Sequence, residues 1–339
     1  MKEFTCLIKG SFEKFNINIS GKTVLTEAAT GNYVCTPVLA ALAGAKVYAI
    51  AKDSKYGSVE QVKNEVFSIA KLLNVDKQIT IIKSLDEIKL RGIDVVTNTG
   101  FVRPINRSLI DKLKPDCVIP LMWEPWEFRP NELDLDYAIN KGIKVYGTNE
   151  SDNRLQTMHY IGLIVLYFLL KEKKNPICSK VLLIGCEKFN HAIECVLKKL
   201  NYSINCFLTD EYKDADVKKY DTIVVAEHSI PRTIIGNSSD ALISGSSITA
   251  DQLIIHITGN VDFNMITCKH YPDKPSPFGY MSYTTDFFDP SAVIDLHAAG
   301  LKVAEGIMEA KTKGLKGKSF KEFMEKNYPA LSFENEKYW

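Results

Sequence analysis

Short apolar runs alternate with amphipathic segments along most of this chain. Apolar runs bounded by polar turns are typical of strands buried on both faces, and the segments between them are typical of helices. Strands that alternate with helices predict a parallel sheet covered on both faces. In the first half, strands are predicted at 23–26, 46–50, 79–82, 93–97, 117–122 and 144–146, and helices at 36–43, 59–73, 108–113 and 134–140. Residues 1–20 alternate weakly and predict a pair of strands.

The pattern stops at a charged, proline-containing segment, residues 171–176, and then resumes. Further strands are predicted at 180–184, 205–209, 222–226 and 253–257, and helices at 191–200 and 298–310. We therefore expect an α/β protein with two doubly wound domains, Rossmann-like or flavodoxin-like. The expected divisions are an N-terminal substrate domain at 1–155, a linking helix and boundary at 156–176, a Rossmann-like domain at 177–296, and C-terminal helices at 297–339 that return to the first domain.

Composition narrows the class of protein. Among 339 residues, Lys and Arg number 42 and Asp and Glu number 41, which gives a net charge of +1. The chain therefore lacks the excess of positive charge that is typical of proteins that bind nucleic acid or an anionic membrane. The longest apolar run, residues 161–170, is too short to span a bilayer. The N-terminus lacks a signal-peptide core, so a cytoplasmic location is expected. None of the eight cysteines forms a C-x-x-C pair, which predicts reduced core residues, such as Cys186, Cys195 and Cys206, and no metal site.

Two segments resemble motifs of the D-isomer-specific 2-hydroxyacid dehydrogenase superfamily, which includes formate and glycerate dehydrogenases. Residues 295–305, DLHAAGLKVAE, are similar to its H-I-A-G-x-x-x-E stretch, and residues 134–149 are similar to its D-L-x-A-x-x-x-G-I-x-V-x-N stretch. The order of predicted strands and helices resembles that of the family over residues 94–310. It implies a substrate domain followed by a Rossmann domain, a last helix that crosses back, NAD or NADP bound between the domains, and a homodimer.

The resemblance places the family's G-x-G-x-x-G turn at 185–190. Only the first glycine, Gly185, is present, and Glu187 and Asn190 take the places of the second and third. The second glycine normally lets backbone amides approach the pyrophosphate, and a carboxylate there repels phosphate. Asp210 ends the next predicted strand. The resemblance implies that it binds the adenosine ribose, as an acid at this position does in the family. The alternative interpretation is a polar residue that only ends a strand.

His297 takes the place of the family's acid/base. Hydride transfer to a carbonyl leaves an alkoxide, so a proton donor with a pKa near neutral is needed. The family's substrate-binding arginine is missing: Thr258 stands at or next to its position, followed by Gly259.

Other catalytic groups are expected after strands of the first half, because ligands of open parallel sheets bind beyond the carboxyl ends of the strands. Arg103 follows one predicted strand, and Glu124 and Arg129 follow another. The turn at Thr30 and Gly31, before a helix, is either an anion site or a polar turn with a capped helix.

These features favour an NAD(P)-dependent oxidoreductase acting on a small hydroxy or oxo metabolite, expected to be acidic, with no nucleic-acid or membrane partner. Two alternatives stay open. One is a non-redox lyase, transferase or ligase on the same scaffold. The other is a non-catalytic ligand sensor that has lost its cofactor site.

Overall fold

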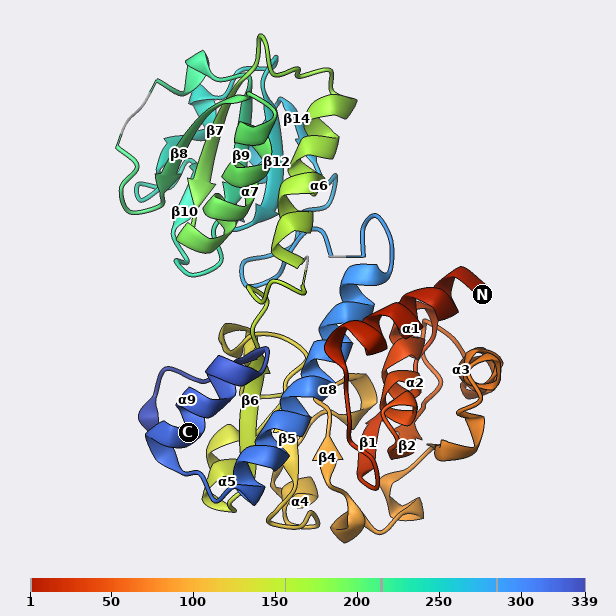
Figure 1. Ribbon diagram of the computed structural model, residues 1–339. Coiled ribbons are helices and arrows are strands. Elements are labelled where there is room, and N and C mark those ends of the chain that lie inside the picture. Colours follow the sequence, from red (N-terminus) through yellow and green to blue (C-terminus); the bar gives the residue numbers. More distant parts are fainter. Residues whose placement is uncertain (1, 156, 214–215, 285, 339) are drawn as a thin grey trace. The chain divides into compact units, whose positions relative to one another are not determined.

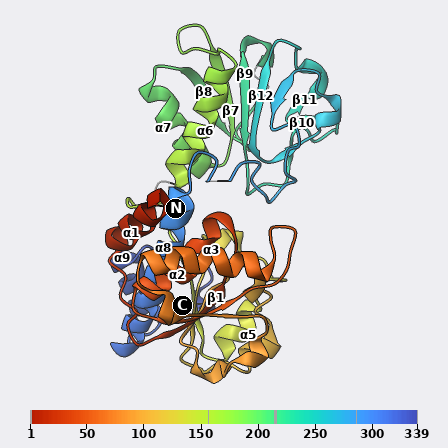
Figure 2. The same ribbon diagram turned by 90° about the vertical axis from the view of Figure 1, so that its right-hand side faces the viewer.

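The computed structural model describes residues 2–155, 157–213, 216–284 and 286–338. It divides into two compact units, Met1–Leu155 with Asp289–Trp339, and Gln156–Phe288, drawn in Figures 1 and 2. Each unit has its own apolar cores.

The first unit is built on a seven-stranded sheet in the order β15-β6-β5-β4-β1-β2-β3. Six strands are parallel, and only β15 is antiparallel to its neighbour β6. The parallel strands follow the doubly wound order 3-2-1-4-5-6, so the chain reverses its direction of travel between β1 and β4. The strands are β1 (Thr23–Glu27), β2 (Lys46–Ile50), β3 (Ile79–Ile82), β4 (Val95–Val96), β5 (Val118–Pro120), β6 (Lys144–Thr148) and β15 (Ala330–Leu331).

Helices cover both faces of this sheet. The helices are α1 (Lys2–Phe15), α2 (Cys35–Leu42), α3 (Val59–Leu72), α4 (Arg107–Ile110), α5 (Leu135–Asn140), α8 (Ser291–Thr312) and α9 (Gly317–Asn327). Alternate strand residues point to opposite faces. The core on the Val24 side therefore contains residues of α1, α2, α3, α8 and α9, whereas the core on the Leu25 side contains residues of α4 and α5. In Figure 1, α8 lies across one face of the sheet beside α1 and α2.

The second unit has a five-stranded parallel sheet in the order β14-β12-β9-β7-β8, which reverses between β7 and β9. Helices α6 (Thr157–Lys171) and α7 (Glu187–Lys199) cover one face. A three-stranded parallel sheet packs on the other face, and Figure 2 shows its strands beside β12. The strands are β7 (Lys180–Gly185), β8 (Ser203–Leu208), β9 (Thr222–Ala226), β12 (Leu253–Thr258) and β14 (Lys269–Tyr271), with β10 (Thr233–Gly236), β11 (Ile243–Ser244) and β13 (Asn260–Val261) in the small sheet.

The predicted α/β class with parallel sheets is confirmed, but the strand pair predicted at residues 1–20 is wrong. Residues 2–15 form α1, whose buried residues Ile8, Ser11 and Phe15 share one face at helical spacing.

The unit limits also differ from those expected. Helix α6 is part of the second unit, because Ile161 and Phe168 lie in its core. Residues 289–296 are part of the first unit, because α8 begins at Ser291 and buries Ile294 there. The second unit therefore comprises 156–288 rather than 177–296.

All eight cysteines are free. Cys35, Cys117 and Cys268 are buried, but the core position predicted for Cys195 is wrong, because it lies on the exposed side of α7. In the described part of the chain, no helix is both long and apolar enough to cross a membrane. Nor do three or more metal-binding side chains come together among these residues.

Candidate functional site

A carboxyl group lies at the point where the first sheet reverses. Glu27 ends β1, and the neighbouring strand β4 leads into the short 3-10 helix η5 (Gly100–Val102). The Phe101 amide donates to Oε1 of Glu27 at 3.1 Å. A Cβ on Gly100 would stand 1.7 Å from that oxygen, so only glycine allows this approach. Ligands of doubly wound sheets bind at such reversal points.

Burial raises the pKa of Glu27, while the Phe101 amide and the nearby Arg103 charge oppose this rise. Behind Glu27, three buried threonine hydroxyls are linked. Thr97 donates to Thr26 at 2.8 Å and lies 2.9 Å from Thr99, which accepts from the Glu27 amide at 3.2 Å. A carboxyl with a raised pKa at this position is a candidate acid/base. The sequence did not single it out, because strand order decides which strand end lies at the reversal point.

His297 lies inside α8, after its first turn, and not at a helix start as predicted. The reason is that the apolar residues 292–294 continue the buried face of the helix. Nδ1 of His297 is 2.5 Å from the Thr36 hydroxyl in the first turn of α2, and the Tyr33 ring meets the imidazole edge-on at 5.6 Å. Burial lowers the pKa of His297 to about 4, so the imidazole is neutral at pH 7.

The carboxylates near His297 in sequence are paired elsewhere. Asp295 forms an ion pair with Lys14 at 2.6 Å. Glu305 pairs with Lys302 at 2.6 Å and accepts from the Asn18 amide at 2.7 Å. The lowered pKa of His297 therefore has burial as its cause, with no acidic neighbour to raise it.

The structure brings two predicted arginines to one carboxylate. Arg103 pairs with Glu132 at 2.5 Å, and Arg129 lies 3.8 Å from the other oxygen of Glu132. The Arg103 guanidinium also lies over the Trp123 ring, 5.4 Å from its centre. Both arginine side chains remain about 30% exposed (28% and 31%), so they keep access to solvent.

Glu124 is almost fully buried. Its oxygens accept hydrogen bonds from Trp126 Nε1 and from the Glu150 amide, each at 2.9 Å. Burial and the neighbouring Glu150 raise the pKa of Glu127 to about 8, with Glu124 adding to the rise. These contacts give Glu124 a structural part in ordering residues 124–127.

The Thr30–Gly31 turn uses its polar groups internally. The Gly31 amide donates to Glu65 at 3.0 Å, and the Thr30 hydroxyl donates to the Tyr56 carbonyl at 3.1 Å. The protein's own carboxylate thus takes the amide that an anion would use, and the anion site considered at Gly31 is not formed.

In the second unit, the predicted cofactor turn lies where the sheet reverses. A Cβ on Gly185 would stand 2.2 Å from the Ala226 carbonyl oxygen, so this glycine is needed for the close approach of β7 and β9. The Asn190 side chain points inward, and Nδ2 donates to the carbonyls of Gly185 (3.2 Å) and Phe207 (2.9 Å). Asn190 is therefore a structural link, and its side chain does not extend over the turn.

Two acidic residues are exposed at this edge. Glu187 lies in the first turn of α7, and Asp210 follows the end of β8. Cys186 precedes α7, with its sulfur 2.9 Å from Nδ1 of His228, two residues after β9. The sequence alone did not reveal this pairing, because the two residues lie 42 positions apart.

Thr258 and Gly259 end β12 on the same side of the sheet. The Thr258 carbonyl accepts from the Glu227 amide at 3.0 Å, and its side chain is buried. Gly259 has a φ of 133°, which disfavours other residues, and a Cβ there would stand 2.9 Å from Val225. His256, in the same strand, is fully buried.

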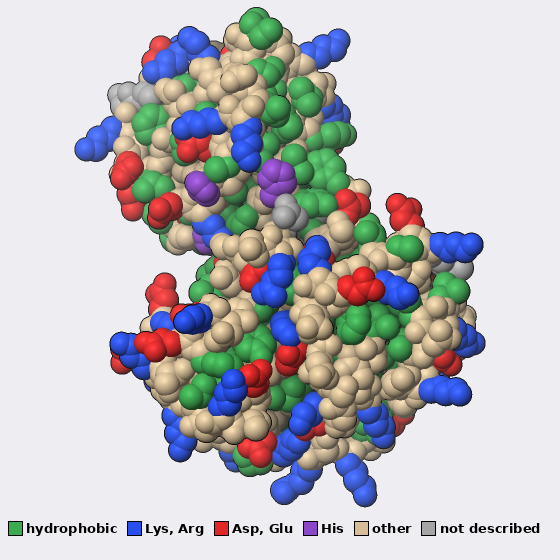
Figure 3. Space-filling view, in the orientation of Figure 1, with side chains coloured by type: hydrophobic (Ala, Val, Ile, Leu, Met, Phe, Trp, Pro, Cys, Tyr) green, Lys and Arg blue, Asp and Glu red, His purple; other side chains and the backbone are tan. Residues whose placement is uncertain are grey.

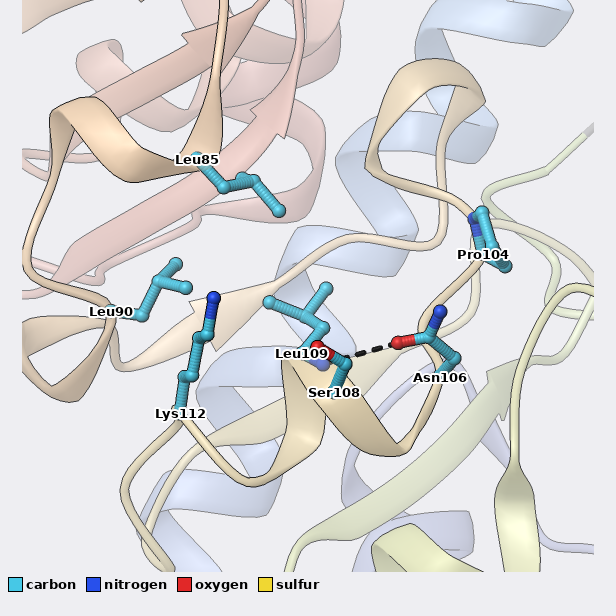
Figure 4. Close-up of a pocket in the computed structure, with 7 residues that line it drawn as sticks. All are labelled: Leu85, Leu90, Pro104, Asn106, Ser108, Leu109 and Lys112. Carbon is cyan, nitrogen blue, oxygen red and sulfur yellow. Dashed lines mark hydrogen bonds between the residues drawn. The ribbon is translucent and has the colours of Figure 1, made fainter.

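A small cavity of about 210 Å³ lies on the first unit, and Figure 4 shows the residues around it. Its lining contains none of the predicted site residues; it consists of Leu85, Leu90, Pro104, Asn106, Ser108, Leu109 and Lys112. The Asn106 side chain there caps α4 by accepting from the Leu109 amide at 3.1 Å.

Comparison with known proteins shows the fold. Neither the models of known protein families nor the curated protein sequences give a match. Among solved structures, dipicolinate synthase from Bacillus subtilis is similar with a TM-score of 0.55 and 15% identity, covering 88% of this chain and 99% of that one. The dipicolinate synthase from Bacillus halodurans gives a TM-score of 0.51 and 10% identity, covering 83% and 96%. D-lactate dehydrogenase with NAD⁺ from Lactobacillus jensenii gives a TM-score of 0.49 and 13% identity, and the match covers 85% of this chain and 97% of that one.

These proteins belong to the D-2-hydroxyacid dehydrogenase-like superfamily. The two dipicolinate synthases, with TM-scores above 0.5, therefore confirm the resemblance inferred from the sequence motifs at the level of the fold alone.

Proposed function

We propose that the protein is an NAD(P)-dependent oxidoreductase that acts on a small acidic hydroxy or oxo metabolite, and that its second unit holds the dinucleotide. The observation that carries this proposal is the edge of the second sheet where the strand order reverses between β7 and β9. The Gly185 turn, the start of α7 and the exposed Asp210 lie there. The similarity in fold to the two dipicolinate synthases supports it.

The residues at this edge fit a dinucleotide. Asp210 stands at the end of β8, where a carboxylate takes the ribose hydroxyls of NAD. The inward hydrogen bonds of Asn190 keep its side chain from covering the start of α7, where a pyrophosphate binds backbone amides. Glu187 is the unfavourable group, because its carboxylate repels phosphate and lowers the affinity.

A bound nicotinamide supplies the hydride acceptor or donor. In the first unit we assign His297 the handling of the substrate proton. The imidazole is neutral at pH 7, so a ring nitrogen can take the proton of a substrate hydroxyl as the alcohol is oxidised. Its pKa of about 4 lies below the near-neutral value expected for this role, so burial makes His297 a weaker base than the sequence predicted. Thr36 holds Nδ1, which fixes the ring and leaves Nε2 as the nitrogen for the substrate oxygen.

We assign Arg103 the binding of a substrate carboxylate. Its guanidinium is held over Trp123 and against Glu132, and the forked geometry of arginine suits a carboxylate. It replaces the arginine that the family has near Thr258. A homodimer remains a proposal from the same resemblance, and sedimentation equilibrium tests it.

The test is a screen of 2-oxo and 2-hydroxy acids with NADH, NADPH and their oxidised forms, followed at the absorbance of the reduced nicotinamide. For an accepted substrate, His297→Gln should lower kcat by about 100-fold, the lower part of the range for a positioned acid/base. His191→Gln, on the exposed side of α7, is the matched control and should keep full activity. Full activity of His297→Gln would reject the role of His297.

A second candidate function is non-redox chemistry in the first unit. It is favoured by Glu27, whose raised pKa and place at the reversal of the first sheet suit an acid/base. Turnover that needs no nicotinamide and is lost in Glu27→Gln would support this candidate. A ligand sensor without catalysis, the third possibility, is favoured by Glu187 at the pyrophosphate turn and predicts binding without turnover.

A further inference from the structure

Cys186 and His228 form a thiol–imidazole pair at the carboxyl edge of the second sheet. Their Sγ–Nδ1 distance is 2.9 Å. Cys186 follows β7 directly, and its amide donates to the Ala226 carbonyl at 3.1 Å. Since Gly185 pairs with Ala226 across the β7–β9 ladder, the register of two central strands fixes the two side chains beside each other.

The imidazole of His228 is held from other sides as well. Its ring lies 4.9 Å from the Phe189 ring at 30°, and Nε2 is 3.3 Å from the Ser229 hydroxyl. Both members of the pair are half-buried, so the pair is held by packing but still reaches solvent. Histidine side chains are visible on the surface of the second unit in Figure 3. A nucleophile beside a base, with the base oriented by a third group, is the arrangement of an activated nucleophile.

The raised pKa of the thiol makes a neighbouring base necessary. Burial raises the pKa of Cys186, and the charge of Glu227 adds to this rise, while the amides of Phe189 and His228 act against it. A protonated thiol is a poor nucleophile toward any electrophile, because the thiolate is the reacting form. Nδ1 of His228, 2.9 Å from the sulfur, is placed to take the proton as a new bond to sulfur forms. Addition to an activated C=C bond needs only this proton transfer and no oxidant.

We propose that Cys186 is a nucleophilic thiol, with His228 as its base, and is the site of covalent modification by small α,β-unsaturated carbonyl compounds. Sγ attacks the β-carbon and forms a C–S bond, and the π pair of the C=C bond moves towards the α-carbon. The thiol proton passes to Nδ1 of His228 and then to the α-carbon. No group is oxidised or reduced in the sum, so no further reactant is needed.

The adduct would stand at the start of α7, beside the turn where the dinucleotide is proposed to bind. Modification of Cys186 would therefore block the nucleotide site. This consequence rests on the proposed function, whereas the reactivity of the thiol does not.

The chain contains its own control. Cys195 lies on the exposed side of α7, with its sulfur 3.5 Å from Nε2 and 3.8 Å from Nδ1 of His191. Both residues are exposed on one helix, so neither is fixed by a strand ladder. Cys6 and Cys178 are exposed as well. If exposure alone controlled reactivity, these three thiols would react faster than Cys186.

The experiment measures the alkylation rate of each cysteine in the intact protein with N-ethylmaleimide, an α,β-unsaturated carbonyl reagent, by mass spectrometry of peptides. In the folded protein, we expect Cys186 to react faster than Cys6, Cys178 and Cys195. In urea, we expect all four cysteines to react at similar rates. His228→Gln should slow Cys186 by about 100-fold, the effect of losing a positioned base. His191→Gln should leave the rate of Cys186 unchanged.

Equal rates of Cys186 in the wild-type protein and in His228→Gln would overturn the proposal, as would a Cys186 that reacts more slowly than Cys195 in the folded wild-type protein. The comparison of folded and urea-treated wild-type protein needs no variant. It therefore tests the reactivity of Cys186 even if His228→Gln fails to fold. NADH should slow the alkylation of Cys186 but not of Cys195. If NADH has no effect while the dependence on His228 holds, the nucleotide site is rejected and the reactive thiol stands.

Discussion

The Thr36 hydroxyl oxygen lies 2.5 Å from Nδ1 of His297 and joins the first turn of α2 to the interior of α8. This contact makes His297 a buried, neutral side chain held in one orientation. The consequences for stability can be measured without knowing the substrate.

The stability of the protein should fall as the pH falls from 6.5 to about 4, in part because of His297. Its pKa is lowered from 6.5 to about 4 by burial. In this window the unfolded chain binds a proton that the folded chain does not, so stability rises with pH. The contribution of His297 is present above pH 6.5 and amounts to about 3 kcal/mol at most, from the size of the pKa change.

Urea unfolding of wild-type protein and His297→Gln at several pH values measures this effect. The difference in unfolding free energy between the two should shrink as the pH falls through the window. A constant difference between pH 7 and pH 4 would show that His297 is not a proton-linked residue of the folded state.

Glu127→Gln should stabilise the protein at alkaline pH. The pKa of Glu127 is raised to about 8 by burial and by Glu150, so its favourable protonated form is lost as the pH rises through that value. The stability that it contributes is complete below the ordinary carboxyl pKa. The glutamine variant should match the wild type near pH 4 and be more stable at pH 9, as measured by thermal unfolding. Glu60→Gln, at an exposed position of α3, serves as the control and should show no such pH dependence.

Gly185→Ala should destabilise the second unit by about 1–3 kcal/mol, the usual range for overpacking. The added Cβ would stand 2.2 Å from the Ala226 carbonyl oxygen, and both atoms belong to central strands. Gly10→Ala is the matched control, because it lies in α1 with open space around it. Chemical unfolding should give unchanged or slightly higher stability for the control. Equal stability of both variants would contradict the close approach of β7 and β9.

Glu187→Gln should raise the affinity for NADH by about two- to fivefold at low salt, which is the effect of one charge at a helix N-terminus. The carboxylate lies in the first turn of α7, where the pyrophosphate is proposed to bind. Glu194→Gln removes a charge from the same helix, but this residue is paired with Lys198 and lies beyond the first turn. Calorimetric titration should give equal affinities for Glu194→Gln and the wild type. A weaker affinity for Glu187→Gln would place the phosphates elsewhere.

Much of the fold was predictable because buried strands leave short, continuous apolar runs in the sequence. The central strands β1, β2, β7 and β9 lie where those runs predicted them. The small sheet of the second unit was not predicted, since β10, β11 and β13 have only two to four residues, too few to show a period. The helix α1 was missed because its buried face is interrupted by polar residues such as Ser11.

The candidate site was less predictable, because it depends on which strands lie side by side. Cys186 and His228 are 42 residues apart and meet only because β7 pairs with β9. Glu27 gains its position from the pairing of β1 with β4. The inward direction of Asn190 was likewise hidden, since the motif alone does not tell whether a side chain covers the turn or points into the sheet.

The most direct test of the account is a calorimetric titration of the protein with NADH and NADPH, repeated with Asp210→Ala. The account predicts saturable binding of one of them at micromolar concentration. If NADH is the ligand, binding should weaken about 10- to 100-fold in Asp210→Ala, from the loss of a charged hydrogen bond. The neighbouring Glu211→Ala, also exposed, should bind as the wild type does. Absence of binding of either dinucleotide to the wild-type protein would contradict the account and leave the Glu27 site of the first unit as the place to look for chemistry.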